Sequence, residues 1–156
     1  MITASSSSEP AERMIDGDLS TRWSSGLAQA AGNWLQIDLG ADQVFDTLFM
    51  NSGTNWGDYA HGYEVFVSAD GEKWNEAAAS GKGNSQSLAV SFNEQKARYV
   101  KIVLTGPADS WWSISELKLA RFGSPAPKTP LPNLSALEDR SGWTVTSSTY
   151  GDVQIP

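Results

Sequence analysis

The sequence contains no cysteine and only one histidine, and each scarcity removes a class of chemistry. Without cysteine there is no thiol nucleophile, no disulfide framework and no thiolate zinc site. A single histidine excludes metal sites built from several histidines and mechanisms that need two of them. The missing cysteine does not identify the compartment, because many secreted bacterial proteins also lack it.

Basic residues are scarce as well, since 11 Lys and Arg stand against 18 Asp and Glu, for a net charge of −7. A negative surface disfavours nucleic acid and anionic membranes as main partners, because both bind basic surfaces. No apolar run approaches the roughly 20 residues that span a bilayer. No signal peptide precedes Ile2, so we expect Met1 to be a start codon added to an excised fragment.

Aromatic residues are abundant by contrast, with seven Trp, four Tyr and five Phe on a chain that is only 19% charged. Many of them fall in short runs of alternating or β-branched character, which predict strands at residues 34–39, 44–50, 63–68, 87–92, 99–105 and 114–122. Asp70-Gly71 predicts a tight turn, and residues 10–15 predict at most one helical turn. The pattern indicates an all-β, antiparallel sandwich.

The composition changes at Gly123, where four prolines occur within ten residues. We therefore predict one domain over residues 1–122 and a semi-rigid linker over residues 123–137. Residues 138–156 are either a plain tail or the first strand of a truncated second module.

The densest polar cluster surrounds Asp16, Asp18 and Thr21. Carboxylates, carbonyls and a hydroxyl are the hard oxygen donors that Ca²⁺ prefers, although the spacing is not that of an EF-hand. The alternative is an Asx-rich turn capped by Thr21, and the spacing alone favours this turn.

Five motifs occur in the order and spacing of a known family. The first reads Asp-Gly-Asp-Leu-Ser-Thr-Arg-Trp-Ser-Ser and the second Trp-Leu-Gln-Ile-Asp-Leu-Gly. Over residues 2–122 the chain resembles a family 32 carbohydrate-binding module, a discoidin-like relative of the coagulation factor V/VIII C-type domain. The motifs span residues 16–25, 34–40, 62–74, 98–102 and 112–117.

This resemblance implies an eight-stranded antiparallel jelly-roll β-sandwich with a structural calcium ion. Carboxylates would come from Asp16 and Glu116, and a hydroxyl and a carbonyl from Thr21. Asp18 would bind through its carbonyl or its side chain. The remaining ligands implied by the family are the carbonyls of Arg13 and Ser115.

The resemblance also divides the tryptophans. Trp23, Trp34 and Trp74 lie in strand motifs and are predicted to be core residues. Trp56 lies in a polar, glycine-bearing loop, and Trp111 and Trp112 follow another loop. One of the two adjacent tryptophans should point inward, because neighbouring strand positions alternate.

Loop aromatics suit sugars, whose rings carry apolar C–H faces. We predict Trp56 or Trp111 as the stacking platform, and Tyr59 and Trp112 as further candidates. Because polar side chains can bond the sugar hydroxyls, we add Asp58, His61 and Glu9 to the predicted ligand-binding residues.

Three function classes follow. The preferred one is a non-catalytic module that holds a secreted bacterial glycoside hydrolase, and any second module beside it, on a neutral or cationic polysaccharide. A hydrolase is disfavoured, because no second carboxylate pair and no Gly-x-Ser-x-Gly motif is present. Adhesion to protein or phospholipid is the other alternative, but Asp58 and Asp109 neighbour the exposed tryptophans.

Overall fold

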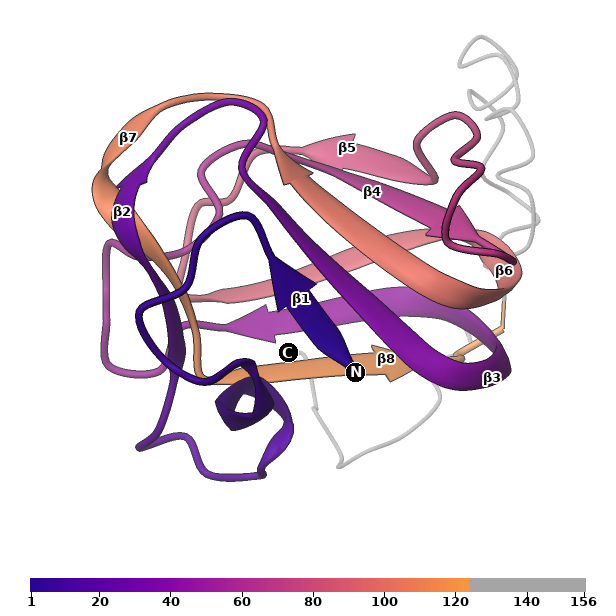
Figure 1. The fold of residues 1–156 in the computed structure, drawn as a ribbon, viewed down its shortest axis with the longest axis horizontal. Coiled ribbons are helices and arrows are strands. Elements are labelled where there is room, and N and C mark those ends of the chain that lie inside the picture. Colours follow the sequence, from indigo (N-terminus) through magenta and orange to yellow (C-terminus); the bar gives the residue numbers. More distant parts are fainter. Residues whose placement is uncertain (124–156) are drawn as a thin grey trace, which may run out of the picture. The chain divides into compact units, whose positions relative to one another are not determined.

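A computed structural model describes residues 1–123 as an antiparallel β-structure with one short 3₁₀ helix (Figure 1). The helix is η1 (Ala11–Ile15), where the sequence predicts a single turn. Residues 124–137 of the predicted linker and the predicted tail over residues 138–156 lie outside the described residues. The strands are β1 (Ile2–Ala4), β2 (Trp23–Gln29), β3 (Trp34–Asn51), β4 (Tyr63–Ser68), β5 (Ala79–Gly81), β6 (Ser87–Leu104), β7 (Ala108–Ile114) and β8 (Glu116–Ala120).

Two long strands build both layers of the sandwich. β3 and β6 have 18 residues each and pair along most of their length. The pairing is interrupted between Asp38 and Gln43, and in Figure 1 both ribbons turn back at this point. The sequence predicts two separate strands in each of these segments. The prediction of two separate strands is wrong in each case, because the predicted gap is a bend within one continuous strand.

The remaining strands extend one layer or the other. β1 pairs with the first half of β3, while β4 and then β5 continue from the second half of β6. β8 pairs with the second half of β3, and β2 pairs with β7 as a separate two-stranded ribbon. The predicted eight-stranded jelly-roll sandwich is confirmed. No helix in the described part is long and apolar enough to cross a membrane.

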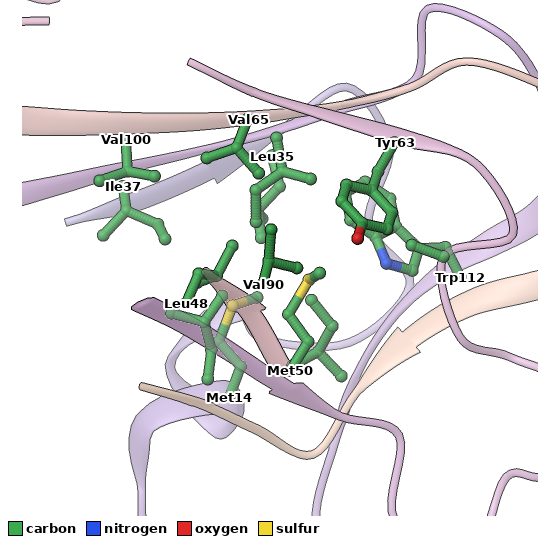
Figure 2. Packing of buried hydrophobic residues seen from close by; sticks show 14 of the residues in the cluster. Met14, Leu35, Ile37, Leu48, Met50, Tyr63, Val65, Val90, Val100 and Trp112 are labelled. Atoms are coloured by element: carbon green, nitrogen blue, oxygen red, sulfur yellow. The ribbon is translucent and has the colours of Figure 1, made fainter. Parts of the chain in front are cut away.

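The apolar core lies between the two halves of β3 and β6 and the strands beside them. Alternation along each strand directs one set of side chains inward. Trp23 joins this core as predicted, and its ring meets the buried Trp112 edge to face at 5.3 Å. Figure 2 shows the facing side chains Leu35, Ile37, Val65 and Val100 on one side and Met14, Leu48, Met50 and Val90 on the other.

Trp34 and Trp74 are not core residues, and the prediction that they are is wrong. Because Leu35 points inward from β3, its neighbour Trp34 points outward and is only half-buried. The ammonium group of Lys101 lies 5.1 Å from the ring centre of Trp34 and 5.2 Å from that of Trp74. The two indoles therefore flank a cation on the outer face of the sheet.

The chain bends at Asp70-Gly71 as predicted, but the bend is not a tight hairpin turn, because residues 69–78 separate β4 from its partner β5. Gly71 has φ +76°, and a side chain there would lie 3.2 Å from the ring of Tyr99. The Asp70 carboxylate accepts hydrogen bonds from the backbone N–H groups of Glu72 and Lys73. Those bonds lower the pKa of Asp70 to about 2.

Candidate functional site

The segments that carry Trp56 and Trp111 meet at one end of the sandwich. The loop over residues 52–62 joins β3 to β4, and β7 begins beside it. The hydroxyl of Ser110 on β7 donates to the Gly57 carbonyl at 2.6 Å and lies 3.4 Å from Nε2 of His61. Nε2 of His61 also lies 3.0 Å from the Gly57 carbonyl. The structure therefore brings the segments of Trp56 and Trp111 together.

A buried glutamine at the end of β2 connects both segments. Gln29 is 3% exposed, and its amide nitrogen donates to the carbonyls of Tyr59 at 2.9 Å and Trp111 at 3.0 Å. Its amide oxygen accepts from the backbone N–H of His61 at 3.2 Å. The role of Gln29 could not be predicted from the sequence, because it depends on three segments that only the fold places together.

Within residues 1–123, the exposed tryptophans are Trp56 and Trp111, with 78% and 44% of their surface accessible. Trp112 is 1% exposed, which confirms that one member of the adjacent pair points inward. As a predicted ligand contact, Trp112 is wrong, because its ring packs against Trp23 inside the core.

Trp56 and Tyr59 line a hollow of about 480 Å³. The ring of Tyr59 stacks on that of His61 with centres 4.4 Å apart and planes 16° from parallel. This stacking holds the tyrosine ring in place and gives His61 a supporting position behind it. The predicted candidates Trp56 and Tyr59 thus share one concave surface, with His61 next to it.

The opposite side of the hollow comes from a loop that sequence reasoning missed. Asn84, Ser85 and Gln86 precede β6 and line the hollow together with Ser87. Oε1 of Gln86 is buried and has no hydrogen-bond partner among the described residues. An unpaired buried acceptor is costly unless a further group satisfies it. The available signal was compositional, a run of glycine, asparagine, serine and glutamine between two strands.

None of the three predicted polar contacts, Asp58, His61 and Glu9, lines this hollow, and neither does Trp111. The Asp58 carboxylate accepts a hydrogen bond from the Ser113 hydroxyl at 2.8 Å and lies 3.9 Å from the guanidinium of Arg22. Glu9 forms an ion pair with Arg13 of η1. Asp58 therefore attaches the 52–62 loop to β7, and Glu9 braces the short helix.

A second polar cluster forms where the loop after η1 meets the start of β8. The Asp16 carboxylate accepts from the Thr21 hydroxyl at 2.6 Å and from the backbone N–H of Asp18 at 2.9 Å. The Thr21 hydroxyl lies 3.2 Å from the Asp18 carbonyl, and the Glu116 carboxylate accepts from the backbone N–H of Gly17 at 2.5 Å. Residues 99 positions apart are thus joined.

The carboxylates of Glu116 and Asp18 in this cluster differ in their surroundings. Glu116 is buried, and its nearest cation is the ammonium of Lys118 at 3.7 Å. The Asp18 carboxylate turns instead to the hydroxyl and backbone N–H of Ser20, and these bonds lower its pKa. Asp18 therefore offers its carbonyl, rather than its side chain, to the interior of the cluster.

The predicted carbonyl ligands come from neighbouring elements. Arg13 lies in η1, with its side chain paired to Glu9. Ser115 is buried between β7 and β8, and its N–H donates to the Asn51 carbonyl at 2.7 Å. Within residues 1–123 no group of three or more acidic or histidine side chains is placed to hold a metal. A hard cation here would depend on two carboxylates, a hydroxyl and backbone carbonyls, a donor set that suits Ca²⁺.

Comparison with known proteins places this fold in a family. The family model of the F5/8 type C domain matches residues 1–117. Among curated proteins, a galactose oxidase of Gibberella zeae is 26% identical over 161 residues, which covers 88% of this chain. The chain spans only 24% of the length of that relative.

Solved structures with the same fold include two carbohydrate-binding modules. Chitosan-binding module 2 of a chitosanase/glucanase from Paenibacillus sp. IK-5, solved with chitotriose, is 25% identical with a TM-score of 0.66. The alignment covers 77% of this chain and 95% of that one. The family 32 module of AlyQ, solved with 4,5-unsaturated mannuronic acid, is 29% identical with a TM-score of 0.62, covering 76% and 92%.

Proposed function

Since the chain belongs to the F5/8 type C domain family, we propose that the module binds a polysaccharide through the hollow lined by Trp56 and Tyr59. The module is a non-catalytic binding domain, as are the similar modules of known structure. The observation that carries the proposal is a tryptophan 78% exposed at the edge of a concave, polar-rimmed surface.

The chemistry of the hollow supports a sugar ligand. An exposed indole offers a flat apolar face to the C–H groups of a pyranose ring, and such rigid aromatic contacts dominate many binding sites. Amide and hydroxyl groups of Asn84, Ser85 and Gln86 surround it and match the hydroxyls of a sugar. The volume of about 480 Å³ lies in the range of about 300–1,000 Å³ that is typical of ligand sites.

The proposed biological role is to target an enzyme to its substrate. We propose that the module attaches a secreted carbohydrate-active enzyme to its substrate and raises the local concentration of the catalytic domain. The similar modules support this, since one was derived from a chitosanase/glucanase and the curated relative is a galactose oxidase. The acidic net charge of −7 favours a neutral or cationic glycan.

A glycan array followed by isothermal titration tests this function. Trp56→Ala should lower the affinity for the best glycan by about tenfold or more, which corresponds to about 1.4 kcal/mol. Trp74→Ala is the matched control. Trp74 lies beside Lys101 on the outer face of the layer that contains β4, away from the hollow. The proposal fails if no glycan binds, or if both variants bind like the wild type. Sedimentation with anionic liposomes distinguishes the adhesion alternative.

We also propose that the cluster of Asp16, Thr21 and Glu116 holds a structural calcium ion, with carbonyls of Arg13, Asp18 and Ser115 completing the shell. The buried Glu116 carboxylate beside the Asp16 loop supports this, since a cation would offset the cost of burying it. Bound calcium would attach the start of β8 to the loop after η1.

Thermal unfolding with calcium and with a chelator tests the cation site. Calcium should raise the Tm of the wild type, by the linkage between binding and folding. Asp16→Asn and Glu116→Gln should remove this response, whereas Asp18→Asn should retain it, because the Asp18 carboxylate bonds Ser20 instead. A chelator that changes neither the Tm nor the calcium content would disprove the site.

A further inference from the structure

A second hollow, of about 470 Å³, lies on the outer face of the layer formed by β8 and the folded-back halves of β3 and β6. Its lining includes Phe49 and Asn51 of β3, Ala89 of β6 and Lys118 of β8. Leu19, more than half exposed, contributes from the loop after η1. The lining also includes Gly17 and Glu116, which belong to the cluster proposed to bind calcium, but no residue of the loop over residues 52–62.

The strand register explains why these side chains share one face. Leu48 and Met50 point into the core, so Phe49 and Asn51 must point outward. Phe49 stands between Ala89 and Lys118 on the neighbouring strands. The ring of Phe49 is half-buried and packs edge to face against that of Phe122, with the ring centres 6.0 Å apart.

The two hollows adjoin at Ser87, which lines both. The Asn51 amide donates to the Ser87 hydroxyl at 3.0 Å, which leaves the hydroxyl proton and one amide proton for another partner. The boundary between the hollows is therefore a polar ridge with free hydrogen-bond donors. A ligand that fills the first hollow can continue over this ridge into the second.

We propose that the two hollows form a single groove that binds the interior of a neutral polysaccharide chain over several sugar residues. This proposal rests on the proposed function of the first hollow and adds the length and charge of the ligand. One sugar would stack on Trp56, the chain would cross at Ser87 and Asn51, and a further sugar would lie on Phe49 and Ala89.

The charges in the second hollow favour a neutral chain. The exposed Lys118 lines this hollow and disfavours a cationic chain, and its ammonium lies 3.7 Å from the buried Glu116 carboxylate, a ligand of the proposed calcium ion. The net charge of −7 on the molecule would repel a polyuronide. The mixture of one aromatic ring, an amide and a hydroxyl suits a polyhydroxylated ligand better than a purely apolar partner.

The test measures how affinity depends on ligand length. Titration calorimetry with β-glucan oligosaccharides and with glucosamine oligosaccharides, each from one to six residues, is performed on the full chain. We expect the affinity of the wild type to rise by about tenfold or more between one and four residues. Ala89→Trp, which places an indole over Phe49, should abolish this rise and leave the affinity for the single sugar unchanged. Ser80→Trp, at an exposed position of β5 in the other layer, should keep it.

The possible outcomes separate the two proposals. If single sugars and hexasaccharides bind equally, or if Ala89→Trp retains the dependence on length, the extended groove is wrong while the first hollow stands. If no oligosaccharide of either series binds, both proposals fail for neutral and cationic glycans. A fall in the mass of the particle on Ala89→Trp, measured by light scattering, would identify a second copy of the chain as the occupant and overturn the glycan groove.

Discussion

Tryptophans of identical chemistry serve different purposes in this domain, and their position within a strand decides which. Trp111 and Trp112 are neighbours, yet 44% of the first is accessible and only 1% of the second. Trp34 faces outward because Leu35 faces inward. An exposed tryptophan therefore identifies a contact surface only after the direction of its side chain is known.

Gln29 is the residue whose substitution should affect both stability and binding. Gln29→Ala leaves the carbonyls of Tyr59 and Trp111 and the N–H of His61 without their partner. We expect the free energy of unfolding to fall by about 1–3 kcal/mol, measured by urea denaturation. Glycan affinity should fall as well, because both aromatic segments lose their common anchor. Gln43→Ala, at an exposed site on β3, should change neither, and equal effects of the two variants would contradict this role.

At the scale of elements, the site consists of two connections held against each other. The loop over residues 82–86 contacts the loop over residues 52–62 at both ends. Gly83 donates its N–H to the His61 carbonyl at 3.2 Å, and Ser52 donates its N–H to the Gln86 carbonyl at 2.9 Å. The hollow between Tyr59 and Gln86 exists because these backbone contacts fix the separation of the two loops.

Gly83→Ala should displace one loop from the other. A methyl group there would lie 2.1 Å from the Ala60 carbonyl oxygen and 2.9 Å from the ring of Tyr59. Because backbone cannot move aside cheaply, we expect a loss of stability of about 1–3 kcal/mol together with weaker glycan binding. Gly106→Ala is the control, since nothing lies within 4 Å of its added methyl group. Wild-type affinity in Gly83→Ala, measured by calorimetry, would show that the loop spacing is unimportant.

The turn after β4 gives a prediction about acid stability. The pKa of Asp70 is lowered to about 2 by the N–H groups of Lys73 and Glu72, against about 3.9 for an unfolded aspartate. The charged form therefore stabilises the fold above about pH 4, and this contribution is lost as the pH falls through about 2. Asp70→Asn should flatten the dependence of Tm on pH in that window, and an unchanged slope would disprove the assignment.

At the scale of the whole molecule, the net charge of −7 acts on any charged polysaccharide. Binding to a cationic chain such as chitosan should weaken as salt rises, because the Debye length shrinks to about 10 Å at 0.1 M. Binding to a neutral glucan should be insensitive to salt. Affinity electrophoresis over a series of salt concentrations measures both, and a salt-independent response to the cationic chain would show that the net charge plays no part.

The sequence by itself determined the all-β class, the family resemblance and the bend at Asp70-Gly71. It also determined that one of Trp111 and Trp112 points inward, without showing which of the two. These features are local, since alternation, turn chemistry and motif spacing act over a few residues. It also named Trp56 and Tyr59, because exposed aromatics in polar loops are unusual.

Only the tertiary structure decided which segments meet. The bends that make β3 and β6 continuous, the anchoring role of Gln29 and the contribution of Asn84, Ser85 and Gln86 depend on residues far apart in the chain. The contact between Glu116 and Gly17 spans 99 positions. Strand pairing sets such contacts, and its register is fixed by burial of one face of each strand against the opposite layer rather than by local sequence.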